Sequence, residues 1–202
     1  MAMTISASYP SSDTTAGEKE RGTLETLFTF PIKSKDIILG KLLSISISTI
    51  VTGILSLILT IVSLTVCNYT FEIYKDTNIM LNGIEILYSV IVIIVYSFMI
   101  SVLSISITSK TKTFKEAQSA LTPLVLISSF PGMIASMIEI KSSLILSIIP
   151  FVNYTVIFSD IINNDIHILQ IILMIFSTII TISIILFIII KQYKSEKVLF
   201  NK

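Results

Sequence analysis

Long stretches without any charged residue are the feature of this sequence that most constrains its fold. The five longest, at residues 42–71, 86–109, 117–138, 142–159 and 166–190, contain 30, 24, 22, 18 and 25 residues. A helix needs about 20 apolar residues to cross the ~30 Å hydrocarbon core of a bilayer. Charged residues make up 13% of the chain, compared with about 25% in soluble domains. The sequence therefore predicts an all-α integral membrane protein.

Four of these stretches are long enough to cross the membrane, and the fifth is predicted to be a broken external or re-entrant hairpin at 142–159. Pro150 lies in the middle of this stretch, where it would remove a helix hydrogen bond. Asn153 would place an amide near the bilayer centre. The predicted membrane spans are residues 42–67, 86–109, 117–138 and 166–190.

The basic residues indicate how such a chain is oriented. With four crossings, 12 of the 14 Lys and Arg residues fall on one side, and only Lys75 and Lys141 fall on the other. Cytoplasmic loops carry such an excess of positive charge. We therefore expect a multi-pass protein of the plasma membrane with both termini in the cytoplasm. Residues 1–36 would form a cytosolic lead, 37–202 the transmembrane domain and 191–202 a cytosolic tail.

Residues 17–31 form a short amphipathic element within the lead. Four consecutive charged residues, from Glu18 to Arg21, are followed by Leu24, Leu27 and Phe28 at helical spacing, and Pro31 ends the pattern. Taken alone, this pattern is typical of an interfacial helix that leads into a membrane span.

The run GEKERGTLETL at 17–27 resembles the first cytoplasmic loop of ABC type-2 exporter permeases, and most closely that of NatB-like sodium-export permeases. Two more blocks occur in the order found in that family. KTFKEAQSALTP at 112–123 resembles the loop into a later span, and PFVN at 150–153 resembles an external motif. The matching residues are Lys115, Glu116, Gln118 and Pro123 in the first of these blocks, and Pro150 and Asn153 in the second.

The resemblance implies that residues 17–31 form a coupling helix, which docks on a separate ABC ATP-binding subunit. That partner would bind ATP and Mg and hydrolyse the ATP, and this chain would bind no cofactor. The chain would be a permease subunit of an ATP-driven exporter, with sodium, a lipid-like molecule or a peptide as cargo. The residues carried over to docking are Gly17, Glu18, Lys19, Glu20, Arg21, Gly22, Thr23, Leu24, Glu25 and Leu27.

Members of that family begin with further spans and a large external domain, so the chain resembles their C-terminal half. Residues 8–13 resemble the tail of the span that precedes the coupling loop. The expected partners in the bilayer are a second permease chain or the missing N-terminal half. The alternative is a truncated or accessory membrane protein that binds an ATPase without transporting.

The residues themselves offer no catalytic or metal chemistry. His167 is the only histidine, and Gly40-Lys41 lacks the surroundings of a nucleotide-binding loop, so we predict no catalytic residue, no metal site and no nucleic-acid partner. A ridge of hydroxyl residues in the first span either packs helices together or lines an export path or dimer seam. The ridge consists of Ser44, Ser48, Thr52, Ser56 and Thr60. Pro123 and Pro131 predict a kinked or interrupted third span.

Overall fold

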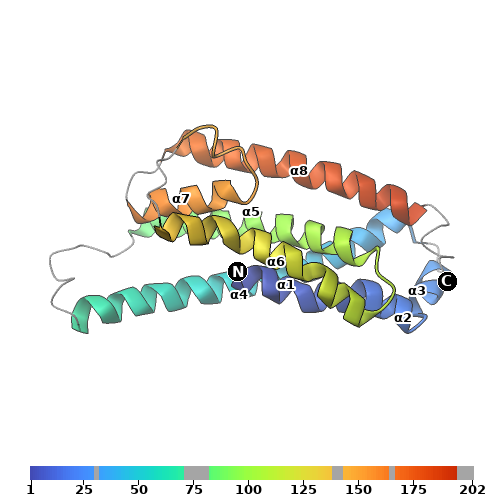
Figure 1. The fold of residues 1–202 in the computed structure, drawn as a ribbon. Coiled ribbons are helices and arrows are strands. Elements are labelled where there is room, and N and C mark those ends of the chain that lie inside the picture. Colours follow the sequence, from blue (N-terminus) through green and yellow to red (C-terminus); the bar gives the residue numbers. More distant parts are fainter. Residues whose placement is uncertain (30–31, 71–81, 138–142, 164–166, 195–202) are drawn as a thin grey trace.

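The computed structural model describes residues 1–29, 32–70, 82–137, 143–163 and 167–194, and these residues form helices and turns without a strand. The long helices run side by side along one axis (Figure 1). In chain order the elements are α1 (Ala2–Ser12), the π-helix η1 (Asp13–Gly17), α2 (Glu18–Glu20), α3 (Thr23–Thr29), α4 (Ser34–Thr70), α5 (Gly83–Thr108), α6 (Phe114–Met137), α7 (Val152–Ile162) and α8 (Ile168–Lys194).

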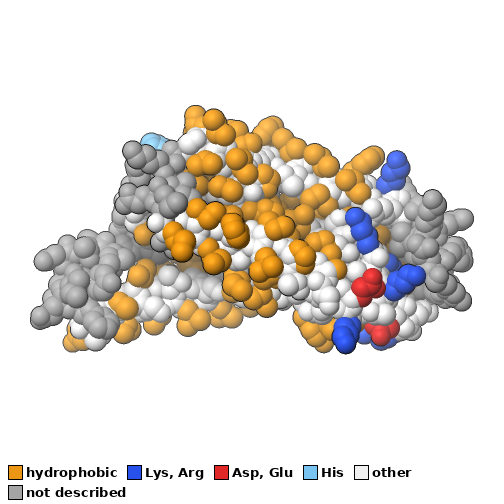
Figure 2. Space-filling model, in the orientation of Figure 1, with side chains coloured by type: hydrophobic (Ala, Val, Ile, Leu, Met, Phe, Trp, Pro, Cys, Tyr) orange, Lys and Arg blue, Asp and Glu red, His pale blue; other side chains and the backbone are white. Residues whose placement is uncertain are grey.

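Four of the described helices, α4, α5, α6 and α8, are long and apolar enough to cross a membrane. The four predicted spans fall on these helices, although residues 138 and 166 lie outside the described part of the chain. Figure 2 shows hydrophobic side chains along the flanks and charged side chains at the end where α2 and α3 lie. Together these features confirm an all-α membrane fold.

Helix α5 is the centre of the bundle and contacts α1, α4, α6, α7 and α8. Three small hydroxyl residues, Ser97, Ser101 and Thr108, are fully buried on it. Ser101 Oγ donates to the Ser97 carbonyl at 2.7 Å, and Thr108 Oγ1 donates to the Ser104 carbonyl at 2.9 Å. Because these hydroxyls bond within their own helix, their small side chains let neighbouring helices approach α5 closely.

Helix α1 belongs to the bundle, which corrects the expected boundary of a cytosolic lead at residue 36. It contacts α4, α5 and α6, and Ala7 is fully buried among them. Thr4 Oγ1 donates to Ser128 Oγ at 2.9 Å and lies 3.2 Å from Tyr96 Oη. Small, uncharged residues allow this close packing, and 11 residues are too few to be recognised as a span from hydropathy.

The expected coupling helix at 17–31 is two short helices, α2 and α3, among the residues described up to Thr29. Gly22 separates them with φ = 71°, a left-handed conformation that glycine adopts without steric cost. The chain therefore changes direction between the charged half and the apolar half of the segment.

The expected hairpin consists of turns over residues 143–151 followed by α7. Phe151 has φ = 69° at the start of α7, and Ser177 Oγ of α8 donates to the Ile148 carbonyl at 2.5 Å. This bond satisfies a carbonyl that the turn leaves without a helical partner. Helix α6 is continuous through Pro123 and Pro131, so it is not interrupted there.

Replacing Gly53 of α4 with alanine should destabilise the bundle. The new Cβ would lie 2.6 Å from Ile93 Cγ2 and 3.0 Å from Met3 Sδ, so α1 and α5 would have to move away. Gly40→Ala on the same helix is the matched control, because no described atom lies within 4 Å of its added Cβ. We expect a lower thermal unfolding midpoint in detergent for Gly53→Ala and an unchanged or higher one for Gly40→Ala. Equal midpoints would contradict the close approach.

Candidate coupling site

The four consecutive charged residues of α2 and the following turn each bond to a different part of the bundle. We call Glu18, Lys19, Glu20, Arg21 and their partners the charged junction. It lies at the end of the bundle where α4 begins, α5 ends and α6 begins (Figure 1). The charges therefore attach this segment to the long helices of the bundle.

The Glu18–Lys41 ion pair joins α2 to α4. Lys41 Nζ lies 2.5 Å from Glu18 Oε2, and it also donates to the Thr14 carbonyl. The Lys41 side chain is only 7% exposed and that of Glu18 is 26% exposed. A charge so poorly solvated needs both partners, since an unpaired buried ammonium is costly. This requirement fixes α2 against the start of the first long helix.

Lys19 and Glu20 bond to the two helix ends that flank the α5–α6 loop. Lys19 Nζ donates to the carbonyls of Ser109 and Thr111, just beyond the end of α5, the second at 3.3 Å. Glu20 Oε2 accepts from the backbone N–H of Phe114, the first residue of α6, at 2.8 Å. A cation thus lies at a helix C-terminus and an anion at a helix N-terminus, which is the arrangement that helix dipoles favour.

Burial lowers the pKa of Lys19 from its ordinary value, and the charge of nearby Lys41 lowers it further, while Glu116 opposes the shift. The two carbonyl acceptors, together with Glu116, hold this partly buried ammonium at the junction.

Arg21 joins the junction to η1, the element that follows α1. Its guanidinium forms an ion pair with Asp13 at 2.9 Å and also donates to the Asp13 carbonyl at 3.3 Å. Both side chains are about half exposed, so the pair contributes little on its own. Gly17 lies beneath it, where an added Cβ would be 3.2 Å from Asp13 Oδ1. The glycine therefore lets the two charged groups, eight residues apart, meet along one side of the chain.

The two sequence blocks at 17–27 and 112–123 meet in space. Besides the bond from Phe114 to Glu20, the Phe114 ring packs edge-to-face against Tyr9 at 5.6 Å. Gln118 Nε2 donates to the Ser8 carbonyl at 3.3 Å, which ties α6 to α1. The Glu116 carboxylate accepts a hydrogen bond from the Lys112 N–H, in the loop just before α6. By contrast, Lys115 and Pro123 are exposed and contribute no bond to the junction.

The remaining candidate docking residues divide into an inner and an outer set. Leu24 is 4% exposed and Leu27 is half-buried, so both face the bundle. Gly22 and Thr23 are exposed, together with Glu20 and Arg21. The side chain of Glu25 lies outside the described part of the structure.

Lys41 and Asp13 are junction residues that the sequence analysis did not single out. Lys41 offered a signal, because a lysine followed by 30 uncharged residues requires an anionic partner near the membrane. Asp13 offered none, since its partner Arg21 stands eight residues away across a π-helix.

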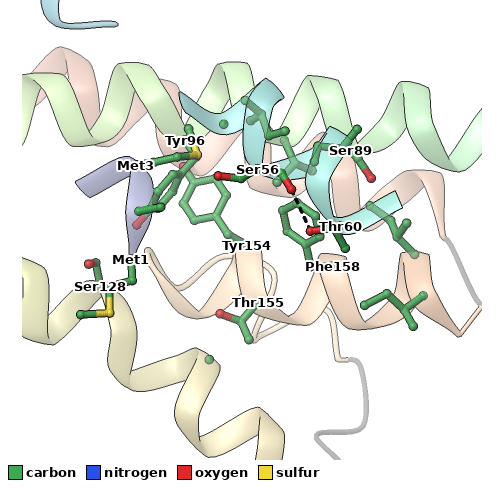
Figure 3. A pocket seen from close by; sticks show the side chains of 18 of the residues that line it. Met1, Met3, Ser56, Thr60, Ser89, Tyr96, Ser128, Tyr154, Thr155 and Phe158 are labelled. Carbon is green, nitrogen blue, oxygen red and sulfur yellow. Dashed lines mark hydrogen bonds between the residues drawn. The ribbon is translucent and has the colours of Figure 1, made fainter. Parts of the chain in front are cut away.

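A cavity of about 730 Å³ lies between α4, α5, α6 and α7, at the other end of α1 from the junction (Figure 3). Its lining is mostly apolar, and the Tyr96 and Tyr154 rings meet edge-to-face at 4.7 Å on its wall. Of the hydroxyl ridge, only Ser56 and Thr60 line the cavity. Their hydroxyls donate to backbone carbonyls four residues earlier, both at 2.8 Å.

The other three members of the hydroxyl ridge lie outside the cavity lining. Thr52 and Ser48 are half-buried and Ser44 is exposed. Thr52 makes the same bond as Ser56 and Thr60, at 3.0 Å to the Ser48 carbonyl.

The external motif forms the corner that begins α7. Asn153 is fully buried, and its side-chain oxygen accepts from the Tyr154 N–H at 2.9 Å. Pro150 lies within the turns that lead into α7 and directly precedes the left-handed Phe151. Both motif residues therefore shape the chain at one wall of the cavity. Among the described residues, no group of three or more His, Cys, Asp or Glu could hold a metal ion.

Removing Glu18 should destabilise the protein by about 3 kcal/mol, since Lys41 would stay buried without its anionic partner, and removing Lys41 should cost less because Glu18 is 26% exposed. We expect Glu18→Gln and Lys41→Gln each to lower the thermal unfolding midpoint in detergent, and the double variant to lose less than the sum of the two. Asp36→Asn removes an exposed carboxylate from the same helix start as a control and should change little. Additive effects of the two substitutions would rule out the pair.

The chain is similar in sequence to known transporter proteins. The family described as ABC-2 family transporter protein matches residues 1–191. The ABC transporter permease protein NatB of Bacillus subtilis (strain 168) is 27% identical over 150 residues, which cover 73% of this chain and 38% of NatB. The chain thus spans well under half the length of this relative, and no solved structure matches it. The motifs predicted this family correctly, and the chain belongs to the ABC-2 family of transporter proteins.

Proposed function

We propose that this chain is the C-terminal part of an exporter permease and that a separate ATP-binding subunit docks on residues 17–29. The observation that carries the proposal is the two-sided character of this segment. On its inner side, Glu18 and Lys19 bond to α4 and to the end of α5, and on its outer side Gly22 and Thr23 are exposed.

A displacement of the docked segment would be passed directly to the membrane helices. The Glu18–Lys41 pair would pull on α4, and the Glu20–Phe114 bond would pull on α6. Since these bonds reach different helices, closure of two ATP-binding subunits would tilt the helices together and change access to the path. In this mechanism the inner charges transmit motion, and the outer face binds the ATPase.

Substitutions on the two sides of the segment should have different effects. Thr23→Lys changes the exposed side of the segment, where it removes the bond from Thr23 Oγ1 to the Glu18 carbonyl but no described bond to α4, α5 or α6. We expect it to weaken co-purification with the ATP-binding protein at least about tenfold, a change of ~1.4 kcal/mol. The thermal unfolding midpoint of the permease should stay unchanged.

Glu18→Gln is the matched inner variant. At temperatures below its lowered unfolding midpoint, it should retain the ATP-binding protein but abolish the stimulation of ATP hydrolysis by the permease, because the link to α4 is lost. Unchanged association of the outer variant with the ATP-binding protein would contradict the docking assignment. Loss of this association in Glu18→Gln, measured while the variant is folded, would place ATPase binding on the inner side of the segment instead.

We further propose sodium as the cargo and the plasma membrane as the location, with both termini in the cytoplasm. Support comes from the resemblance of residues 17–27 and 112–123 to sodium-export permeases, and from the charged side chains at the junction end. The excess of Lys and Arg at that end is typical of a cytoplasmic face.

Sodium transport should require ATP, the ATP-binding subunit and a second permease polypeptide. In inside-out vesicles that contain all three components, we expect ATP-dependent uptake of radioactive sodium, and the Glu18→Gln variant should abolish it. Uptake of another ion or of an organic solute in place of sodium would contradict the proposed cargo. ATPase binding without any transport in the complete assembly would instead favour an accessory role.

A further inference from the structure

A groove of about 600 Å³ lies between α1 and α6 and shares no lining residue with the cavity described above. We call it the α1–α6 groove. Its apolar part is formed by Ile5 of α1 and by Leu121 and Val125 of α6. Ile5 is 51% exposed and Val125 is half-buried, so the groove is open on its outer side. Since α6 is long and apolar enough to cross a membrane, this part of the groove opens toward lipid.

The other end of the α1–α6 groove is more polar and lies nearer the charged junction. Tyr9 and Phe114 form this end, with their rings edge-to-face at 5.6 Å, and Gln118 lines it one turn further along α6. Tyr9 is 66% exposed, and its hydroxyl makes no hydrogen bond to another described residue. Aromatic side chains with a polar tip are typical of the depth at which hydrocarbon meets lipid headgroups. The groove therefore runs from the hydrocarbon to the membrane surface.

Lys115 stands at the polar end of the groove. It lies three residues before Gln118 and seven before Thr122 on α6, and both of these residues line the groove. Residues at this spacing share one face of a helix. Lys115 matched the family motif in the sequence, yet its exposed side chain contributes nothing to the junction. Its position is that of a cation beside an open, amphipathic groove.

The loop before α6 adds more positive charge at the same place. Lys110 and Lys112 are exposed like Lys115, and none of the three forms an ion pair with a described carboxylate. The carboxylates of Glu20 and Glu116 accept backbone N–H groups at the start of α6 instead. Residues 110–116 contain three lysines and one glutamate, which gives a net charge of +2. Figure 2 shows charged side chains gathered at this end and hydrophobic ones along the flank.

We propose that the α1–α6 groove binds an anionic phospholipid from the leaflet at the junction end. An acyl chain would lie along Ile5, Leu121 and Val125, and the phosphate would lie beside Lys115 and the Tyr9 hydroxyl. Clusters of lysines next to a membrane helix attract anionic lipids, whereas a headgroup with its own ammonium would bring a further positive charge to the cluster. The lipid would contact α1 and α6 together and hold the two helices side by side.

Charge complementarity selects a lipid over a protein partner. An apolar helix of another polypeptide would fill the groove but would leave the three lysines without counter-charges. An anionic phospholipid supplies an apolar chain and a negative charge in one molecule, in the same order as the groove presents its apolar and basic parts.

Lipid-dependent stability tests the proposal on the purified protein in detergent. We expect phosphatidylglycerol to raise the thermal unfolding midpoint by about 3 °C more than phosphatidylcholine does, because a ligand that binds the folded state stabilises it. In native mass spectrometry, Lys112→Gln combined with Lys115→Gln should retain phosphatidylglycerol about tenfold less than the unchanged protein.

Two further variants separate a defined site from a general attraction of charge. Lys33→Gln combined with Lys35→Gln removes the same charge from exposed positions at the start of α4, outside the groove lining, and should retain phosphatidylglycerol fully. Val125→Trp keeps every lysine but fills the apolar part of the groove, and it should lower the retention.

Four results would overturn the proposal. Equal midpoint shifts with the two lipids would mean that the headgroup is not recognised. Equal losses in the two lysine variants would mean diffuse attraction, and full retention by Val125→Trp would place the lipid elsewhere. A disulfide-linked dimer of Ile5→Cys in a Cys67→Ser background would assign the groove to a second copy of the chain. These readouts need neither an ATPase nor transport, so they stand or fall separately from the proposed function.

Discussion

A lysine with almost no access to solvent determines how this end of the bundle is built. Lys41 stands at the start of 30 uncharged residues and is 7% exposed, so its ammonium must find acceptors within the protein. Glu18 and the Thr14 carbonyl supply them, and this brings the segment after α1 back onto α4. Once Glu18 is held there, its neighbours in the sequence are carried to the ends of α5 and α6. One buried charge thus fixes the position of the whole charged junction.

The junction also joins two distant sequence blocks that resemble the same family. The bond from the Phe114 N–H to Glu20 and the packing of Phe114 on Tyr9 join residues more than 90 positions apart. The carboxylate of Glu20 caps α6, while Glu116 bonds within the loop that precedes the same helix. Each block therefore completes the other, and neither would be structurally satisfied by its own residues.

The sequence was sufficient to predict the long helices, because crossing a bilayer demands about 20 apolar residues and few other folds do. It was not sufficient for α1, whose 11 residues carry polar Thr and Ser side chains that bond to Ser128 or to their own backbone. Nor did it reveal the bonding partners of the charged residues 18–21, which lie on α4, α6, η1 and the loop between α5 and α6. A run such as Glu18–Arg21 has the same pattern whether it faces water or four different helix ends, and only partners distant in sequence distinguish the two.

Packing along α4 is uneven, and this has a mechanical consequence. Near the junction the helix is held by buried residues and an ion pair, whereas none of its described side chains from 54 to 67 is buried. With 37 residues, α4 is about 55 Å long, so a small rotation at the junction becomes a larger displacement at the far end. A helix that is fixed at one end and loosely packed at the other can transmit motion only if its open face is supported.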